Sequence, residues 1–151
     1  MIPTFPSAAQ TRAIITEIIQ QDGRQVTFNV VASLSGCWNC TLDPISDTST
    51  DSFCPICSGV HWIPTYSGWD TVAHVTWGKS EDKDWQTGGM IDNGDCTVKF
   101  MHTPEAEAIV HAAEYVVVDD RIMQTIPGGI ILRGVPTINR VIVKLREKEQ
   151  E

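Results

Sequence analysis

The sequence predicts a mainly β protein: a small antiparallel β-barrel with an N-terminal helix and a cysteine-rich loop inserted between two strands. Three observations favour this class. Short segments alternate apolar and polar residues and are separated by turn residues, which is typical of barrels and sandwiches. One segment near the start has helical spacing instead. A third stretch holds four of the five cysteines.

The bulk composition is that of an ordinary globular domain. The chain has 151 residues, 42% hydrophobic and 20% charged, which points to a single domain over 1–151. No apolar run approaches the roughly 18–20 residues of a membrane helix. The start, "MIPTFPSAAQTR", lacks the basic and apolar segments of a secretory signal, so we expect none. The net charge of −8 argues against wrapping nucleic acid, because phosphate neutralisation needs clustered Lys and Arg.

Residues 6–23 predict the helix. Ser7 is a plausible N-cap and Gln10 follows three residues later, as in a capping box, and Gly23 ends the segment. An apolar stripe at helical spacing, which we expect to pack on the core, consists of Ile14, Ile15, Ile18 and Ile19.

The remaining elements are mostly strands. Alternation places them at 24–32, at 69–77, at 96–102, on both sides of a turn at Asp119–Asp120 within 115–126, and twice within 128–148. A short helix is predicted between two of the strands, because Thr103 and Pro104 are followed by acidic residues in the first turn. A loop is the alternative.

The cysteines form two Cys-x-x-Cys pairs, Cys37 with Cys40 and Cys54 with Cys57. A tetrahedral zinc ion needs four such ligands converging on one point, and each pair can aim two thiolates at it. The segment between the pairs, "TLDPISDTSTDSF", has little to bury and would not hold itself together, so a metal would supply what a core cannot. Gly36 and Gly59 allow tight turns beside the pairs. We therefore predict a structural zinc site in a 36–62 insertion.

Other interpretations of the cysteines stay open. They are two disulfides, a redox dithiol, or a rubredoxin-like iron centre with the same four ligands. His61 is an alternative ligand close to Cys57. The fifth cysteine, Cys96, alternates with Val98 and Phe100 and is expected to be a buried thiol in a strand.

No catalytic motif is apparent, and we predict that the chain is not an enzyme. The histidines have no partner at a diagnostic spacing; they are His61, His74, His102 and His111. The carboxylate pairs Asp119–Asp120 and Glu81–Asp82 fall where turns are expected. Four of the five tryptophans lie in or near the cysteine loop and the next strand, and we expect them to pack around the cysteine pairs.

Four stretches carry a family resemblance: the first helix leading into "DGRQVTFNVVA", the hairpin "EYVVVDDRIMQTI", the closing "RGVPTINRVIVKLREK", and the cysteine segment "CWNCTLDPISDTSTDSFCPICSG". Together they resemble the small head–tail connector proteins of tailed bacteriophages, particularly the head-closure or stopper type. The resemblance covers most of the chain.

The resemblance implies a virion protein of the phage neck, assembled in the host cytoplasm. Such proteins are small β-barrels that form a ring, often a hexamer, below the portal and adaptor, close the DNA channel after packaging and present a surface to the tail. DNA would pass the channel without specific binding, and an acidic chain suits such a lining. The polar segment Lys79–Asp95 is a candidate lumen or gate loop, with a plain surface loop as the alternative.

Other functions compete with this one. A tail terminator or tail-completion protein would share the architecture. A zinc-ribbon module binding nucleic acid or a protein partner is possible, but 36–69 contains no Lys or Arg. A thiol oxidoreductase using Cys37 and Cys40 would need a strand, the cysteine pair and a helix in succession, and an acidic loop follows the pair instead.

Overall fold

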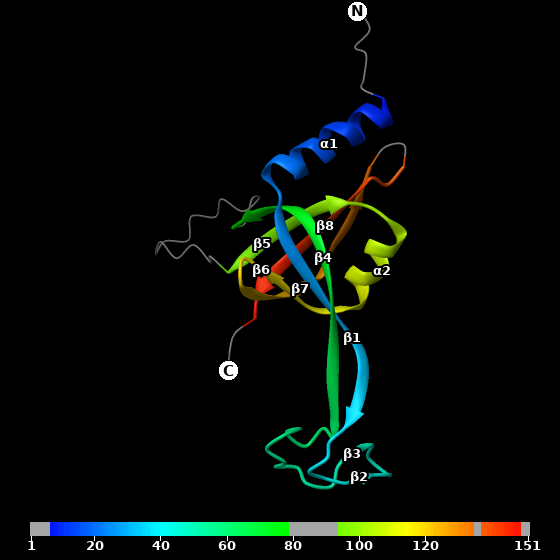
Figure 1. The fold of residues 1–151 in the computed structure, drawn as a ribbon, viewed down its shortest axis with the longest axis vertical. Helices are drawn as coiled ribbons and strands as arrows, with labels where there is room; N and C mark the ends of the chain where they lie inside the picture. The colour runs from blue at the N-terminus through cyan, green and yellow to red at the C-terminus, as the bar shows by residue number, and fades with distance from the viewer. Residues whose placement is uncertain (1–6, 79–93, 135–136, 149–151) are drawn as a thin grey trace, which may run out of the picture. The chain divides into compact units, whose positions relative to one another are not determined.

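The structure is a computed structural model that describes residues 7–78, 94–134 and 137–148. Within these residues the chain forms two helices and eight strands (Figure 1). They are α1 (Ala8–Asp22), β1 (Arg24–Gly36), β2 (Leu42–Asp43), β3 (Thr48–Ser49), β4 (Trp62–Trp77), β5 (Asp95–Met101), α2 (Pro104–Ala112), β6 (Ala113–Val118), β7 (Arg121–Arg133) and β8 (Arg140–Glu147). A mainly β chain with an N-terminal helix and a cysteine-rich loop was predicted, and this is confirmed.

The chain divides into two compact units. The main unit comprises Met1–Asn29 with Gly68–Glu151, and the cysteine-rich unit comprises Val30–Ser67. The insertion predicted over 36–62 lies within the second unit. Strands β1 and β4 contribute residues to both units.

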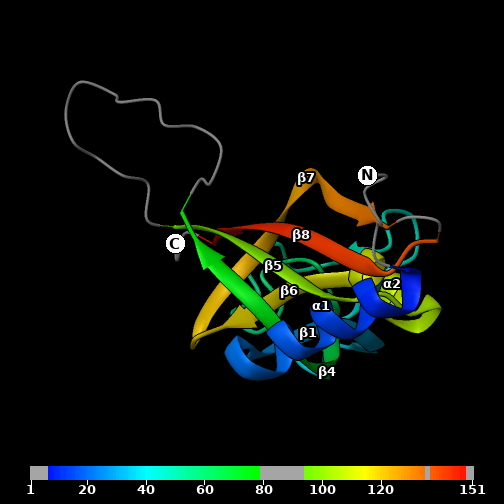
Figure 2. The ribbon, with the colours of Figure 1, turned by 90° about the horizontal axis from the view of Figure 1, so that it is seen from above.

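Six strands form one sheet whose hydrogen-bonded neighbours follow the order β1-β4-β5-β8-β7-β6, and this order closes on itself as in a barrel. The pairs β4–β5, β5–β8, β8–β7 and β7–β6 are antiparallel. Figure 2 shows β5, β8 and β7 running side by side in the main unit. The two short strands β2 and β3 pair separately, with Leu42 opposite Ser49 and Asp43 opposite Thr48.

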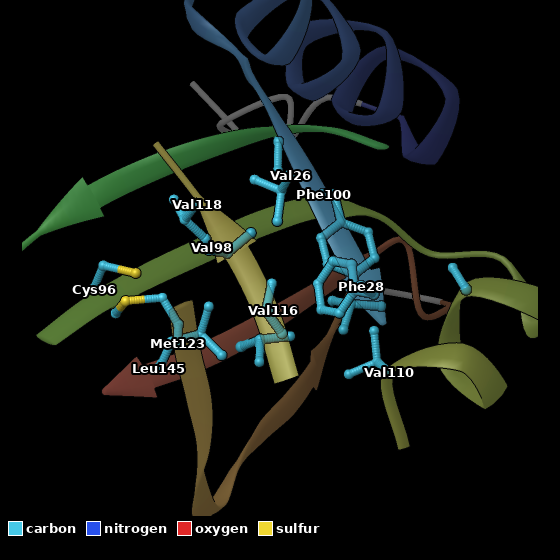
Figure 3. Close-up of a cluster of buried hydrophobic side chains, with 14 residues drawn as sticks. Val26, Phe28, Cys96, Val98, Phe100, Val110, Val116, Val118, Met123 and Leu145 are labelled. Carbon is cyan, nitrogen blue, oxygen red and sulfur yellow. The ribbon is translucent and has the colours of Figure 1, made fainter. Parts of the chain in front are cut away.

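Alternate residues of the six-stranded sheet point inward and build the core (Figure 3). Val98, Val143 and Leu145 have no exposed surface, whereas their neighbours along each strand are only partly buried or exposed. Phe28, Trp69 and Phe100 pack with ring centroids 5.5–6.0 Å apart. Cys96 is 2% exposed in this core, as predicted for a buried strand thiol.

Helix α1 begins with the predicted capping box. Gln10 N donates to Ser7 Oγ, and Ser7 N donates to Gln10 Oε1. The helix ends at Gly23, whose backbone is extended. The expectation that the isoleucine stripe packs on the core is wrong for half of it: Ile19 is buried, but Ile14 and Ile18 are 52% and 51% exposed.

Helix α2 is confirmed. Thr103 caps it by accepting a hydrogen bond from Ala106 N, and Pro104 occupies the first turn. Ala106 and Val110 are its buried residues, so the helix packs one face on the core. Just before it, His102 Nε2 lies 2.7 Å from Glu107 Oε2.

The hairpin between β6 and β7 turns where it was predicted. Val118 pairs with Arg121, and Asp119 and Asp120 between them have φ values of 48° and 63°. Two residues at positive φ make the tight turn that matches the twist of the flanking strands. The Asp119 carboxylate also accepts hydrogen bonds from Arg24 Nη1 and Trp77 Nε1, at 2.6 and 3.1 Å.

The strands are fewer and longer than expected after residue 120. The two segments predicted around "RIMQTI" and "GGIILR" are one strand, β7, with a register irregularity between Thr125 and Ile130. Proline and two glycines at 127–129 bend the strand at this point instead of ending it. Strands β1 and β4 likewise extend beyond the predicted segments, into the cysteine-rich unit.

Candidate metal centre

The four cysteines of the two pairs come together at the ends of two strands. Cys37 directly follows β1, and the second pair precedes β4 by a short turn. Cys37 N donates to the carbonyl oxygen of His61 at 2.8 Å, which fixes the end of one strand against the start of the other. In the second pair, Ser58 N donates to Cys54 O at 2.8 Å. Backbone hydrogen bonds therefore position both pairs.

All four Sγ atoms lie within 4.8 Å of one another. Cys37 Sγ is 3.8 Å from Cys54 Sγ, and Cys40 Sγ is 3.5 Å from Cys57 Sγ. Zinc–sulfur bonds of about 2.3 Å in a regular tetrahedron place sulfurs about 3.8 Å apart. The spacing therefore fits one tetrahedral ion, and the four cysteines can hold a metal.

The alternative of two disulfides does not match this arrangement. All five cysteines are free thiols, and the short S···S distances exceed the roughly 2.05 Å of a disulfide. Two of the contacts join one pair to the other, Cys37 to Cys54 and Cys40 to Cys57.

Three polar side chains contact the cysteine sulfurs, and these contacts were not predicted. Asn39 Nδ2 donates to Cys54 Sγ at 3.5 Å, and His61 Nδ1 lies 3.5 Å from Cys40 Sγ. The Ser49 side chain, also buried, contacts Cys40. Hydrogen bonds of this kind orient thiolate ligands and disperse their charge. Asn39 stands inside the first pair, where a short amide side chain is within reach of sulfur, and this is the one signal that the sequence offered.

His61 stands beside the cluster. It contacts the single sulfur of Cys40, while the set of mutually close ligand atoms is formed by the cysteines. Its ring also packs edge-on against Trp62, with centroids 5.3 Å apart. The geometry therefore gives His61 the position of a hydrogen-bonding neighbour of a ligand.

The pKa values of two of the four thiols are shifted, in opposite directions. The Asn39 side chain, followed by the backbone N–H groups of Cys57 and Ile56, lowers the pKa of Cys54 from 9.0 to about 6. The Ser49 hydroxyl acts to lower the pKa of Cys40, but burial and contact with the other three thiols outweigh it and raise this pKa to about 12. One thiolate thus forms readily and a second beside it does not. A cation at the centre would stabilise the thiolate form of each cysteine, so a second thiolate could form beside the first.

Several residues around the second pair have left-handed backbone conformations. Ser58 and His61 have φ values of 49° and 71°, and Gly59 has 85°. A Cβ on Gly59 would lie 2.8 Å from Ser52 O, so the nearby backbone leaves no room for a side chain and glycine is required here, as predicted. Non-glycine residues at positive φ persist only when their surroundings hold them, as ligands fixed to one ion would.

Acidic side chains of the polar segment between the pairs form local turns with the backbone. Asp43 accepts hydrogen bonds from Ile45 N and Ser46 Oγ, and these lower the pKa of its carboxyl group. The Asp51 carboxylate accepts from Phe53 N in the same way. Short acidic and hydroxyl side chains form turns with the backbone two residues on. The composition of the segment does not reveal these turns, because they depend on the positions of the residues.

Most of the tryptophans do not pack around the cysteines as predicted, and Trp62 comes near them only by packing against His61. Trp38, inside the first pair, is 82% exposed. Trp69 and Trp77 pack against the core of the main unit. Trp85 lies outside the described residues.

The other candidate histidines belong to the main unit. His74 lies 3.8 Å from Asp22, His102 contacts Glu107, and His111 is exposed. In the described part of the chain, the cysteine set is the one group of three or more His, Cys, Asp or Glu side chains close enough to share a metal. The proposed gate loop, Lys79–Asp95, lies outside the described residues for 79–93, and Asp95 begins β5.

No known protein-family model matches the chain, and no curated protein matches it. Neither α1 nor α2 has the length and hydropathy needed to cross a membrane. The connector resemblance therefore stays a prediction.

Proposed function

We propose that this chain is a structural virion protein of a tailed bacteriophage, a head-closure or stopper protein whose copies form a ring in the neck between the portal or adaptor and the tail. One structural observation supports a role in binding other proteins more than a role in catalysis. The cysteine-rich unit buries mainly cysteines and exposes large apolar side chains: Trp38 is 82%, Phe53 92% and Ile45 95% exposed. Exposed apolar side chains mark a partner-binding surface where they form a contiguous patch, and these three residues belong to one compact unit.

The metal in this proposal is zinc, in a structural role. Four thiolates complete a tetrahedral shell and leave no position for a reacting water. A zinc ion would hold a unit whose described core contains no fully buried aliphatic or aromatic side chain. Iron would use the same ligands, so the two are separated by metal analysis of the purified protein together with its visible absorption, because tetrathiolate iron is coloured and zinc is not.

The closed strand order of the main unit supports the small-barrel architecture that the connector resemblance implies. DNA would pass through the ring without specific binding. The described residues of the cysteine-rich unit include three aspartates and no Lys or Arg, and the whole chain carries a net charge of −8. Like charge keeps a polyanion from adhering.

The experiment is to delete the gene in the phage and examine the particles by electron microscopy. A head-closure protein predicts DNA-filled heads that lose their DNA and lack tails, with complete tails free in the lysate. Heads that retain DNA, or tails of abnormal length, would support a tail-completion or tail-terminator role instead. Intact infectious virions would refute the proposal.

The zinc-ribbon alternative has a separate test. No Lys or Arg occurs between Arg24 and Lys79, so phosphate contacts from this stretch are absent. Mobility-shift assays with duplex DNA and RNA at physiological salt should therefore detect no tight complex. A specific complex that is lost in Cys37→Ser would favour the alternative.

A further inference from the structure

We propose that the turn between β2 and β3 of one copy docks on the outer face of strands β5, β8 and β7 of a second copy. This inference rests on the ring assembly proposed above and names the two surfaces that would meet.

The outer face of the three strands carries a group of cations, the basic stripe: Lys99, Arg133, Arg140 and Lys144. The inward residues Val98, Val141 and Val143 are fully buried, so the alternating positions point outward. Arg140 pairs with Arg133 on one side and with Met101 on the other, which places the two arginines side by side.

Apolar side chains lie within the stripe. Ile142 pairs with Lys99 in β5 and with Ile131 in β7, so two isoleucines separate the arginines from Lys144. Arg133 and Lys144 are exposed, and the isoleucines are half-buried. Three strands and five residues along β8 span an area of about 10 Å by 14 Å. This area is apolar at its centre, with Arg133 and Lys144 exposed at its ends. Arg140 and Lys99 are half-buried, the Arg140 Nε atom is buried, and Thr16 of α1 contacts Met101 beside Arg140.

The stripe has few carboxylates to neutralise it. Within the described residues, none of its four cations forms an ion pair. Asp95 lies on the same face of β5 but is 3.1 Å from Arg146 Nε and is thereby engaged. This local positive charge, on a chain of net charge −8, is electrostatically complementary to an acidic partner.

The turn between β2 and β3, which we call the acidic knob, is defined by Asp43, Ile45 and Asp47. Asp47 N donates to Asp43 O at 2.9 Å, so the chain closes into one compact turn. Ile45 is 95% exposed at its centre, with an aspartate two residues away on each side. Thiolate ligation of a divalent metal would add further negative charge to this unit.

The knob and the stripe match in both charge and apolar character. Ile45 would cover Ile131 and Ile142, and the flanking carboxylates would approach the cations at the ends of the stripe. A nucleic acid would satisfy the cations but offer nothing to the isoleucines, and the net charge of the chain would repel it. A contact between two different surfaces of identical chains is head-to-tail, and such contacts generate rings when the rotation closes.

The test is sedimentation velocity of the full metal-loaded chain over a range of concentrations. Lys144→Glu alone and Asp47→Lys alone should each weaken self-association by about tenfold, since each replaces an attraction by a repulsion. Asp47→Asn, which tolerates the φ of 55° at this position, should weaken it less. The double variant Asp47→Lys with Lys144→Glu should restore association, because both surfaces are then reversed.

Arg12→Glu is the matched control. It makes the same change of charge on an exposed residue of α1, outside the stripe, and should leave association unchanged. If the wild-type chain assembles and Lys144→Glu assembles equally well, the docking inference is wrong while ring formation stands. If the wild-type chain is a monomer at every concentration, both proposals fail. Loss of duplex DNA binding in Lys144→Glu without loss of assembly would assign the stripe to nucleic acid and overturn the inference.

Discussion

Replacing one buried cysteine of the cluster should unfold the cysteine-rich unit and leave the main unit intact. In Cys54→Ser a hydroxyl replaces the sulfur of a residue that is 1% exposed, and this sulfur lies 3.8 Å from Cys37 Sγ. The buried hydrophobic residues of this unit are cysteines, with Ile63 only partly buried beside them. Structural zinc contributes about 10–16 kcal/mol in small domains, so no other interaction in the unit can compensate for losing it.

The assay combines metal analysis with two proteases. Wild-type protein should retain one zinc per chain after gel filtration, and Cys54→Ser should retain much less. Chymotrypsin cleaves after aromatic residues and should cut at Trp38 or Phe53 once the unit unfolds. Trypsin finds no Lys or Arg between Arg24 and Lys79, so it reports on the main unit and should cut both proteins alike.

Cys96→Ser is the matched control, because Cys96 is also nearly inaccessible, at 2% exposed, but lies in the core of the main unit. It should keep its zinc and lose about 1–3 kcal/mol of unfolding free energy, since a hydroxyl without a partner replaces a thiol. A Cys54→Ser variant that holds a full equivalent of zinc and resists chymotrypsin as wild type does would show that the unit does not depend on this ligand.

Three further predictions follow from other sites. Burial, with Asp119 and Asp95 adding to it, raises the pKa of Cys96 from 9.0 to about 12. Above pH 9 the folded chain therefore binds more protons than the unfolded chain. The unfolding free energy measured in urea should fall as pH rises through this range, and less so in Cys96→Ala. Asp120→Gly removes the cost of a φ of 63° and should stabilise the main unit by about 1 kcal/mol, a rise in Tm of roughly 2–4 °C by calorimetry; an unchanged or lower Tm would contradict the strain argument. Gly59→Ala places a Cβ 2.8 Å from a carbonyl oxygen at a φ of 85° and should speed zinc loss to a chelator, whereas Gly128→Ala, at a φ of 72° with open space around it, should not; equal rates of zinc loss would count against a strained turn.

Local signals in the sequence were reliable where one short segment determines the structure. The capping box of Ser7 and Gln10, the proline start of α2 and the turn at Asp119–Asp120 each involve neighbours within four residues. Their energetics do not depend on the rest of the fold. The convergence of the cysteines was predictable for a related reason, because each pair is a local turn and the sole long-range requirement is that the two turns meet.

Features decided by distant contacts were not predictable in this way. The sequence does not tell that Ile14 and Ile18 face away from the core, because this depends on where α1 packs. Pro127 and two glycines mark a strand end by local rules, yet pairing with β8 on both sides of the irregularity keeps β7 one strand. The contacts of His61 and Ser49 with sulfur depend on how the segment between the pairs folds back.

The Asp119 carboxylate has a consequence for the order of folding. It joins the turn between β6 and β7 to Arg24, 95 residues earlier, and to Trp77, 42 residues earlier. Strands β1 and β6 meet at this side of the sheet, so the seam can close only after most of the chain has been synthesised. Contacts of such long sequence separation are formed late and slowly, on the scale of milliseconds to seconds for β proteins. Until then the free edges of β1 and β6 are open to pairing with another nascent chain.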